Sequence, residues 1–361
     1  MEQNEKSVRK KIKFKYAFCV DWSIIMANIS VLGAGSWGLG LALLLNNNGH
    51  NVTVWSVLND EVVMLQTERE HKRCLPGVRI PDSITVSGDT ANVINNADVL
   101  VLAVASPYTR STAKLITPFV KEGQIIVNVA KGVEEHTLLT LCQIVEEEIP
   151  QAKVAVLSGP SHAEEVSRGI PTTCVIGAHE KNTAEYLQNI FMSDVFRVYT
   201  SPDMLGICIG GALKNVIALA AGIADGLGYG DNTKAALITR GNAEITRLGV
   251  AMGANPHTFS GLSGIGDLIV TCASMHSRNR RAGILIGKGY TKDQAMEEVQ
   301  MVVEGVFSAK AALELSKKYN IEMPIVEQVN KVLFEDKPAA EAVKELMLRD
   351  KKIEIDNSEW K

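Results

Sequence analysis

The pattern of apolar positions along the chain changes near residue 202. Before this point, short apolar runs typical of buried strands alternate with segments of helical periodicity. We expect strands over residues 28–32, 51–55, 99–104, 125–129, 154–157, 172–176 and 195–199. After Pro202 the pattern is almost wholly helical as far as about Leu348. This order predicts an α/β domain over residues 26–201 and an all-α domain over residues 202–361.

The longest apolar stretch covers residues 204–227 and carries Lys214 near its middle, followed by Asn215. It is too long for a strand and contains no proline, so we expect a helix. A membrane span is disfavoured, because a lysine at the centre of a span costs about 2.5–3.5 kcal/mol. Two interpretations stay open at this point. One is a core helix whose lysine reaches the surface, and the other is a functional lysine whose pKa is lowered by burial.

A glycine-rich turn, GAGSWG over residues 33–38, lies between the first predicted strand and a helical pattern over residues 39–47. Gly33 permits a tight turn, Gly35 allows the backbone to approach a pyrophosphate, and Gly38 lets the helix and the strand pack closely. The N–H groups of the helix N-terminus would bind the anion. The alternative is a glycine turn without a ligand, but the flanking elements favour a Rossmann-type doubly wound sheet that binds a dinucleotide.

The second predicted strand is followed by Ser56, Val57 and Leu58. A domain specific for NAD usually has an acid here, which binds the ribose hydroxyls. The first acids and the nearest arginines come later, at Asp60, Glu61, Arg69 and Arg73. The missing acid favours NADP, or tolerance of both nucleotides.

Other polar residues follow the predicted strands directly. In a doubly wound sheet, ligands bind at the carboxyl ends of the strands. The residues at such ends are Tyr108, Lys131, Ser161 and Ala163. We therefore expect them near the ligand, although a solvated surface lysine is the alternative for Lys131.

Polar and small residues also interrupt the helical half. Residues 261–268 contain Asp267, and Thr271 follows it one helical turn later. Residues 277–281, Ser-Arg-Asn-Arg-Arg, predict an anion site, although an exposed basic helix start is as compatible with them. Residues 302–305 are either a cap or part of a site. A lysine and an aspartate could handle the proton of an alcohol or a carbonyl while a nicotinamide handles the hydride.

The composition excludes several other functions. The chain has 361 residues, of which 46% are hydrophobic and 22% charged, as is usual in globular proteins. A net charge of −4 and an aromatic content of 5% argue against nucleic-acid binding. The six cysteines have no CxxC spacing, so we expect no metal site and a reducing, cytoplasmic compartment. Residues 1–25 do not share the periodic pattern, and we expect a disordered extension rather than a signal peptide.

From about Ala27 to Leu348 the chain resembles the bacterial NAD(P)-dependent glycerol-3-phosphate dehydrogenases. The shared segments are GAGSWG at 33–38, AKG at 130–132, SGPSHA at 158–163, ALKNVIALAAGIADGL at 212–227, GLSGIGDL at 261–268, SRNR at 277–280 and VVEG at 302–305. Their common order over nearly the whole chain makes the resemblance more specific than any single motif. Ser56, Val57 and Leu58 depart from it, because the family often has a basic residue there.

The resemblance implies reversible reduction of dihydroxyacetone phosphate to sn-glycerol 3-phosphate for glycerophospholipid synthesis, with NADP or NAD as cofactor. Lys214 would transfer the proton, with Lys131 and Asp267 as further catalytic residues. The implied substrate contacts are Lys131, Gly159, Ser161, Lys214, Asn215, Asp267, Thr271, Ser277, Arg278 and Asn279. The implied cofactor contacts are Gly33, Gly35, Ser36, Trp37, Gly38, Tyr108, Lys131, Ala163, Arg278, Val302 and Glu304.

Two other functions stay open. A two-domain hydroxyacid dehydrogenase of the 6-phosphogluconate type shares the glycine turn and a lysine–asparagine pair on a helix. A nucleotide-sensing module without catalysis is the second, and the joint presence of Lys131, Lys214, Asp267 and Arg278 argues against it. The apolar helices of the second half are also compatible with a homodimer.

Overall fold

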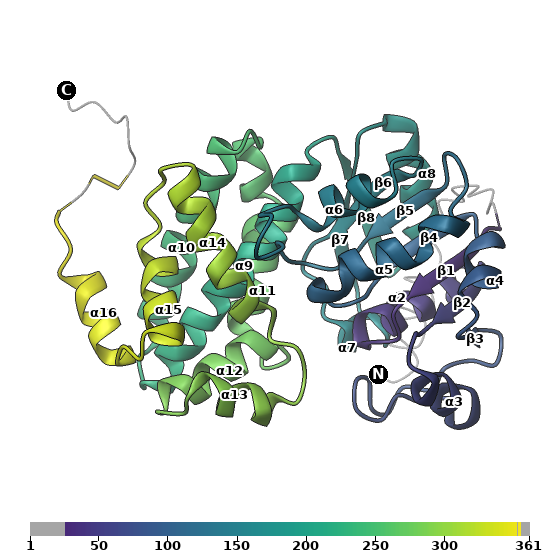
Figure 1. Cartoon of the computed structure of the whole chain (residues 1–361). Coiled ribbons are helices and arrows are strands. Elements are labelled where there is room, and N and C mark those ends of the chain that lie inside the picture. The colour runs from purple at the N-terminus through teal and green to yellow at the C-terminus, as the bar shows by residue number, and fades with distance from the viewer. Residues whose placement is uncertain (1–25, 352, 355–361) are drawn as a thin grey trace, which may run out of the picture.

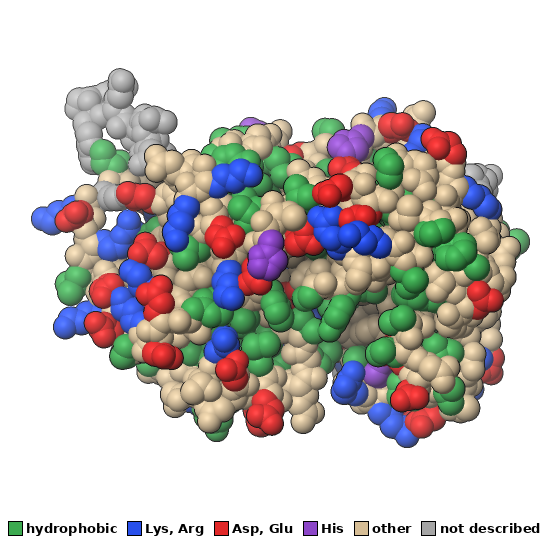
Figure 2. All heavy atoms as spheres, in the orientation of Figure 1, with side chains coloured by type: hydrophobic (Ala, Val, Ile, Leu, Met, Phe, Trp, Pro, Cys, Tyr) green, Lys and Arg blue, Asp and Glu red, His purple; other side chains and the backbone are tan. Residues whose placement is uncertain are grey.

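The computed structural model describes residues 26–351, 353 and 354. The extension expected over residues 1–25 lies outside the described residues. Two halves stand side by side in Figure 1: a sheet covered by helices, and a bundle of helices. The long helix α9 (Met204–Gly226) lies where the two halves meet. On the face drawn in Figure 2, acidic and basic side chains are intermixed over both halves.

The sheet half has eight strands in the order β3-β2-β1-β4-β5-β6-β7-β8. The strands are β1 (Asn28–Leu32), β2 (Asn51–Trp55), β3 (Thr85–Ser87), β4 (Val99–Leu102), β5 (Ile125–Asn128), β6 (Lys153–Ser158), β7 (Thr172–Ala178) and β8 (Phe196–Ser201). Neighbouring strands are parallel except β6 and β7, which are antiparallel. The predicted Rossmann-type sheet is confirmed. The strand β3 was not predicted, because its three residues are too few for a periodic signal.

The sheet is buried on both faces. In β4, Val99 and Val101 enter one core while Leu100 and Leu102 enter another. Helices cover both faces, which explains why the central strands are apolar at most positions rather than at alternate ones. These helices are α2 (Ser36–Asn47), α3 (Asn59–Glu68), α4 (Thr90–Asn95), α5 (Thr109–Ile116), α6 (Leu141–Glu148), α7 (Ala163–Val166) and α8 (Lys181–Phe191).

Helix α9 joins the cores of the two halves. Its first turns pack on the sheet through Met204, Ile207 and Cys208, and from Ile209 onward it forms the core of the helical half. Among the described residues it is the one helix long and apolar enough to cross a membrane, yet 94% of its apolar window is buried inside the protein. This burial is what a core helix shows.

The other helices of this half pack on α9 or on the helices next to it. They are α10 (Asp231–Ala251), α11 (Asp267–Ala273), α12 (Arg278–Gly287), α13 (Lys292–Val299), α14 (Glu304–Lys318), α15 (Pro324–Phe334) and α16 (Ala339–Met347). The all-α second half is therefore confirmed. Two helices begin inside the stretches where polar and small residues interrupt the apolar pattern: α11 begins at Asp267, and α12 begins at Arg278.

Helices α9 and α12 touch backbone to backbone. A Cβ atom on Gly222 would lie 2.2 Å from the carbonyl oxygen of Arg280, and one on Gly226 would lie 2.3 Å from that of Ile284. On the facing helix, a Cβ on Gly283 would lie 2.2 Å from the carbonyl oxygen of Leu219. The glycines thus allow a contact that larger residues would prevent, and it places the start of α12 beside the middle of α9.

Candidate active site

The glycine turn has the geometry of a pyrophosphate-binding loop. Gly33 has a φ of +118°, and a Cβ on Gly38 would lie 2.0 Å from the carbonyl oxygen of Gly33. A Cβ on Gly35 would meet no atom within 4 Å, so the backbone there is open to a ligand. Gly35 is also the N-cap of α2, whose first N–H groups have no side-chain cap. These features fit a dinucleotide whose phosphates lie at the N-terminus of α2.

Lys214 is buried on α9, and its ammonium group has protein partners for two of its three hydrogens. It donates to Oδ1 of Asp267 and, at 2.7 Å, to Oγ1 of Thr271. The Thr271 hydroxyl in turn donates to the backbone carbonyl of Asp267 at 2.6 Å. Burial lowers the pKa of Lys214 to about 7; Asp267 opposes this shift, and the charge of Lys131 adds to it. The side chain lines a pocket between the two halves and can therefore exchange a proton with a ligand near neutral pH.

Lys131 reaches the same aspartate from the other half. It follows β5, and its Nζ lies 2.6 Å from Oδ2 of Asp267 and 3.1 Å from the carbonyl oxygen of Gly159. A Cβ on Gly211 would lie 3.4 Å from Cγ of Lys131, so this glycine of α9 leaves room for the lysine side chain. Asp267 itself is 1% exposed and accepts one hydrogen bond from each lysine.

The start of α12 supplies a second set of polar groups to the pocket. The Ser277 side chain is the N-cap and accepts from the N–H of Arg280 at 3.2 Å. Arg280 is directed away to Asp225 at 2.8 Å, whereas Arg278 lines the pocket. Asn279 is buried. The residues of the predicted anion site therefore lie at the N-terminus of a helix, with Arg278 at the pocket and Arg280 turned away from it.

Buried polar contacts tie this site to the rest of the helical half. The amide nitrogen of Asn279 donates to Oδ1 of Asn215 at 2.9 Å, and its oxygen accepts from the N–H of Gly305 at 2.8 Å. Glu304 accepts from the N–H of Ser106 at 3.2 Å and from its hydroxyl, which links the halves. Burial raises the pKa of Glu304, although the hydrogen bonds from Ser106 oppose this shift.

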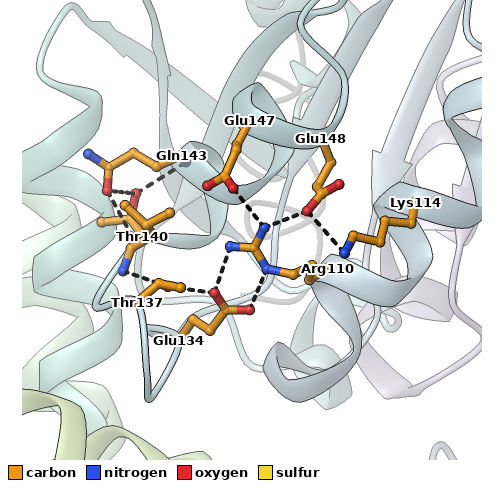
Figure 3. A network of polar contacts seen from close by, with 9 residues as sticks. Arg110, Lys114, Glu134, Thr137, Thr140, Gln143, Glu147 and Glu148 are labelled. Atoms are coloured by element: carbon orange, nitrogen blue, oxygen red, sulfur yellow. Dashed lines mark hydrogen bonds and ion pairs between the residues drawn. The ribbon is translucent and has the colours of Figure 1, made fainter.

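The loop that follows Lys131 is held by a network of charged side chains. Figure 3 shows Arg110 of α5 between Glu134 of the loop and two glutamates of α6. Its Nη2 lies 2.7 Å from Glu134 Oε2 and its Nε lies 2.8 Å from Oε1, a bidentate pair. Its Nη1 contacts Glu147 at 3.2 Å and Glu148 at 2.5 Å. The loop carrying Lys131 is thereby fastened to two helices of the sheet half.

Most of the residues suggested by the sequence meet in this one pocket. Those that line it are Gly35, Ser36, Trp37, Lys131, Ser161, Ala163, Lys214, Asn215, Thr271, Ser277, Arg278, Asn279, Val302 and Glu304. Gly33 and Gly38 shape the turn behind it, and Gly159 and Asp267 hold the lysines. Tyr108 is 59% exposed and is not brought into the pocket, so its contact with a cofactor stays a prediction.

Two histidines of the pocket were not identified from the sequence. His162 and His276 both line it, and their ring centroids lie 5.7 Å apart. Burial lowers the pKa of His162, and the charge of Lys214 lowers it further. His162 follows the strand β6 within the segment that contains Ser161, so the strand-end rule offered a signal for it. No group of three or more metal-ligating side chains occurs within residues 26–351, 353 and 354.

Comparisons with known proteins agree over most of the chain. Family models described as the N-terminus and the C-terminus of NAD-dependent glycerol-3-phosphate dehydrogenase match residues 28–184 and 203–344. A protein of Agathobacter rectalis named glycerol-3-phosphate dehydrogenase [NAD(P)+] is 64% identical over 336 residues, which are 93% of this chain and 100% of that protein. A Bacillus subtilis protein of the same name is 50% identical over 335 residues, 92% of this chain and 97% of its own.

Solved structures give the same result. The crystal structure of glycerol-3-phosphate dehydrogenase from Coxiella burnetii has a TM-score of 0.87 and 35% identity, and the match covers 90% of this chain and 99% of that one. A ketopantoate reductase from Ralstonia eutropha has a TM-score of 0.58 at 15% identity, covering 89% of this chain and 99% of its own, and shares the fold alone.

Proposed function

The chain belongs to the NAD-dependent glycerol-3-phosphate dehydrogenase family, and we propose a role for each group of its pocket in that reaction. The protein is an NAD(P)-dependent oxidoreductase that interconverts dihydroxyacetone phosphate and sn-glycerol 3-phosphate. The observation that carries the proposed roles is the pairing of Lys131 and Lys214 on Asp267, in a pocket shared by the glycine turn and the start of α12.

Proton transfer is assigned to Lys214. When bound, a nicotinamide would supply or accept the hydride at C2 of the substrate. Two hydrogens of the Lys214 ammonium are committed to Asp267 and Thr271, so the third is left for the oxygen on C2. In the direction of reduction, Lys214 donates a proton to this oxygen as the alcohol forms. In the direction of oxidation, the neutral amine accepts it.

Substrate binding is assigned to groups from both halves. Arg278 and the N–H groups at the start of α12 would bind the phosphate, with the Ser277 and Asn279 side chains beside them. Lys131 adds a cation that attracts the phosphate-bearing substrate. Asp267 holds both lysines in place and compensates part of their charge, and Thr271 orients Lys214.

The cofactor would lie along the N-terminus of α2, with Ser36, Trp37 and Ala163 lining its path. The pocket lining also includes Val302, shortly before α14, and Glu304, the first residue of α14. Because Glu304 also bonds Ser106, cofactor binding would depend on the two halves being held together.

We propose that the protein acts in the cytoplasm and that it supplies sn-glycerol 3-phosphate for glycerophospholipid synthesis. We also propose that it forms a homodimer. The scattered free cysteines support a reducing compartment. Sedimentation at several protein concentrations tests the dimer, and a monomer at micromolar concentration would contradict it.

Initial rates with dihydroxyacetone phosphate and each reduced nicotinamide test the function. We expect turnover that saturates in the ketone phosphate. Oxidation of 3-hydroxy acids in preference to sn-glycerol 3-phosphate would favour a dehydrogenase of the 6-phosphogluconate type. Tight cofactor binding without turnover of either substrate would favour a nucleotide-sensing module.

A further inference from the structure

The end of β2 is the point where a sheet of this type holds the ribose of the adenosine half of the dinucleotide. The carbonyl oxygen of Trp55, the last residue of β2, accepts from the N–H of Gly33 at 2.9 Å. The strand end and the glycine turn are therefore in direct contact. NAD carries a hydroxyl at the 2′ position of this ribose and NADP carries a phosphate, so the groups around Ser56 decide between them.

Helix α3 brings the acid Glu61 to this strand end, although Glu61 does not directly follow the strand in the sequence. The Ser56 hydroxyl donates to Oε2 of Glu61 at 2.5 Å and accepts from the N–H of Leu58 at 3.2 Å. Nε2 of His71 lies 3.0 Å from the other oxygen of Glu61. The Ser56 hydroxyl thus has no hydrogen left for a phosphate, whereas each carboxylate oxygen of Glu61 retains a lone pair for a ribose hydroxyl.

Glu61 is negatively charged at neutral pH. Burial acts to raise its pKa, but the hydrogen bonds from His71 and Ser56 outweigh burial, and the pKa lies below its ordinary value. Hydrogen bonds with Cys74 and Glu61 raise the pKa of His71 to about 9. The backbone N–H of Cys74, however, points to Nδ1 of His71 at 3.3 Å, which fits the uncharged ring with its proton on Nε2. In either state Nε2 donates to Glu61, so the carboxylate keeps its role as an acceptor.

Apart from His71, whose Nε2 is already bonded to Glu61, few cations face this position. Val57 and Leu58, directly after the strand, are 69% and 58% exposed and carry no charge. Arg69 is held by Asp82 at 3.5 Å and donates to a backbone carbonyl. Arg73 is exposed, and it lies close enough for its charge to lower the pKa of Glu61.

We propose that this protein binds NAD(H) in preference to NADP(H), and that Ser56 and Glu61 select against the 2′-phosphate. The oxygens of Glu61 accept from the ribose hydroxyl of NAD, and a 2′-phosphate would meet a like charge. This inference rests on the proposed function and specifies its cofactor. The sequence favoured NADP because no acid directly follows the second strand. In the folded protein, Glu61 of the next helix lies at the end of that strand.

Calorimetric titration of the full chain tests this preference without turnover. The ligands are NAD⁺, NADP⁺, and the fragments 5′-AMP and adenosine 2′,5′-bisphosphate, which differ by the 2′-phosphate alone. We expect NAD⁺ and 5′-AMP to bind about tenfold more tightly than their 2′-phosphorylated counterparts, or about 1.4 kcal/mol. Equal or tighter binding of NADP⁺ overturns the inference. Failure of all four ligands to bind would instead refute the dinucleotide site on which the proposed function rests.

Three substitutions identify the residues responsible. Glu61→Gln removes the negative charge of the carboxylate. We expect NADP⁺ to bind this variant more tightly, so that the preference for NAD⁺ over NADP⁺ falls from about tenfold to about twofold. Glu68→Gln, on the last turn of α3 and paired with Lys72, is the matched control and should change neither affinity. Arg73→Gln should leave NAD⁺ affinity unchanged and weaken NADP⁺ binding only slightly, because Arg73 is exposed and its charge is screened by salt. A loss of NADP⁺ binding in Arg73→Gln would show that this arginine binds a 2′-phosphate and would overturn the assignment. The ratio of NAD⁺ to NADP⁺ affinity of the unmodified chain tests the preference even if the Glu61→Gln variant does not fold.

Discussion

The two lysines that share Asp267 are held in position in different ways. Lys131 lies on a loop at the carboxyl end of the sheet, and its side chain is 18% exposed. Lys214 lies in the middle of a core helix, and its side chain is 8% exposed. Burial lowers the pKa of Lys214 to about 7. One carboxylate can therefore hold two ammonium groups of different solvation, and the more deeply buried one is suited to proton transfer.

The largest expected effect follows from removing the buried member of the pair. Lys214→Ala should lower turnover about 10²- to 10⁴-fold, the range for loss of a general acid–base group. Nucleotide affinity should stay within a few fold, because the glycine turn belongs to the other half. Steady-state rates and nucleotide titration measure the two quantities, with the exposed Lys317→Ala of α14 as control. Near-normal turnover in Lys214→Ala would show that proton transfer lies elsewhere.

The next effect concerns the anion site at the start of α12. Arg278→Ala removes a charged hydrogen-bond donor from the pocket. A hydrogen bond between such a donor and a charged partner contributes about 1.5–3 kcal/mol. We expect the Michaelis constant for dihydroxyacetone phosphate to rise about 10- to 100-fold, with a smaller change in turnover number. Arg281→Ala, on the same helix but outside the lining of the pocket, is the matched control. Unchanged kinetics of Arg278→Ala would exclude it from the site.

A smaller effect tests whether the two lysines are electrically coupled. Reduction needs protonated Lys214, so its rate should fall as the pH rises through about 7, while oxidation should rise over the same interval. The charge of Lys131 lowers the pKa of Lys214, and Lys131→Met should therefore raise that pKa and move both transitions to higher pH. We also expect a loss of about tenfold in kcat/KM for the phosphate substrate. Transitions that stay in place would show that the lysines act independently, and a move to lower pH would contradict the expected sign of their coupling.

The sequence revealed the residues of the sheet half better than their partners. The glycine turn, Lys131, Ser161 and Ala163 could be placed because parallel strands bring their carboxyl ends to one edge. That rule also covered His162, which was overlooked. It did not cover Glu61, the acid proposed to select the nucleotide, because Glu61 reaches Ser56 through the packing of α3 against the strand end.

In the helical half the sequence marked the important residues but not their contacts. The apolar stretch around Lys214 predicted a helix but left open whether the lysine is buried or reaches the surface, and the spacing of Asp267 and Thr271 corresponds to one helical turn. That Asp267 bonds both lysines depends on how α11 packs against α9 and on the approach of the sheet. Such contacts between distant segments leave no periodic signal. The bond between Ser106 and Glu304 is of the same kind.

The smallest expected effect tests how the loop of Lys131 is held. Glu134→Gln weakens the bidentate pair with Arg110 while keeping the shape of the side chain. The matched control is Glu147→Gln, which weakens another contact of the same arginine without touching the loop, since Glu147 lies on α6 and is 56% exposed. We expect Glu134→Gln to lower kcat/KM for dihydroxyacetone phosphate by up to about fivefold, the equivalent of 1 kcal/mol for a partly exposed pair. The effect of Glu134→Gln should appear in the Michaelis constant for the ketone phosphate, because the loop carries Lys131. Nucleotide affinity should not change, because the glycine turn lies in another part of the sheet half. If the two variants behave alike, the network of Arg110 stabilises the sheet half in general, and the position of Lys131 is set by Asp267 and Gly159 alone.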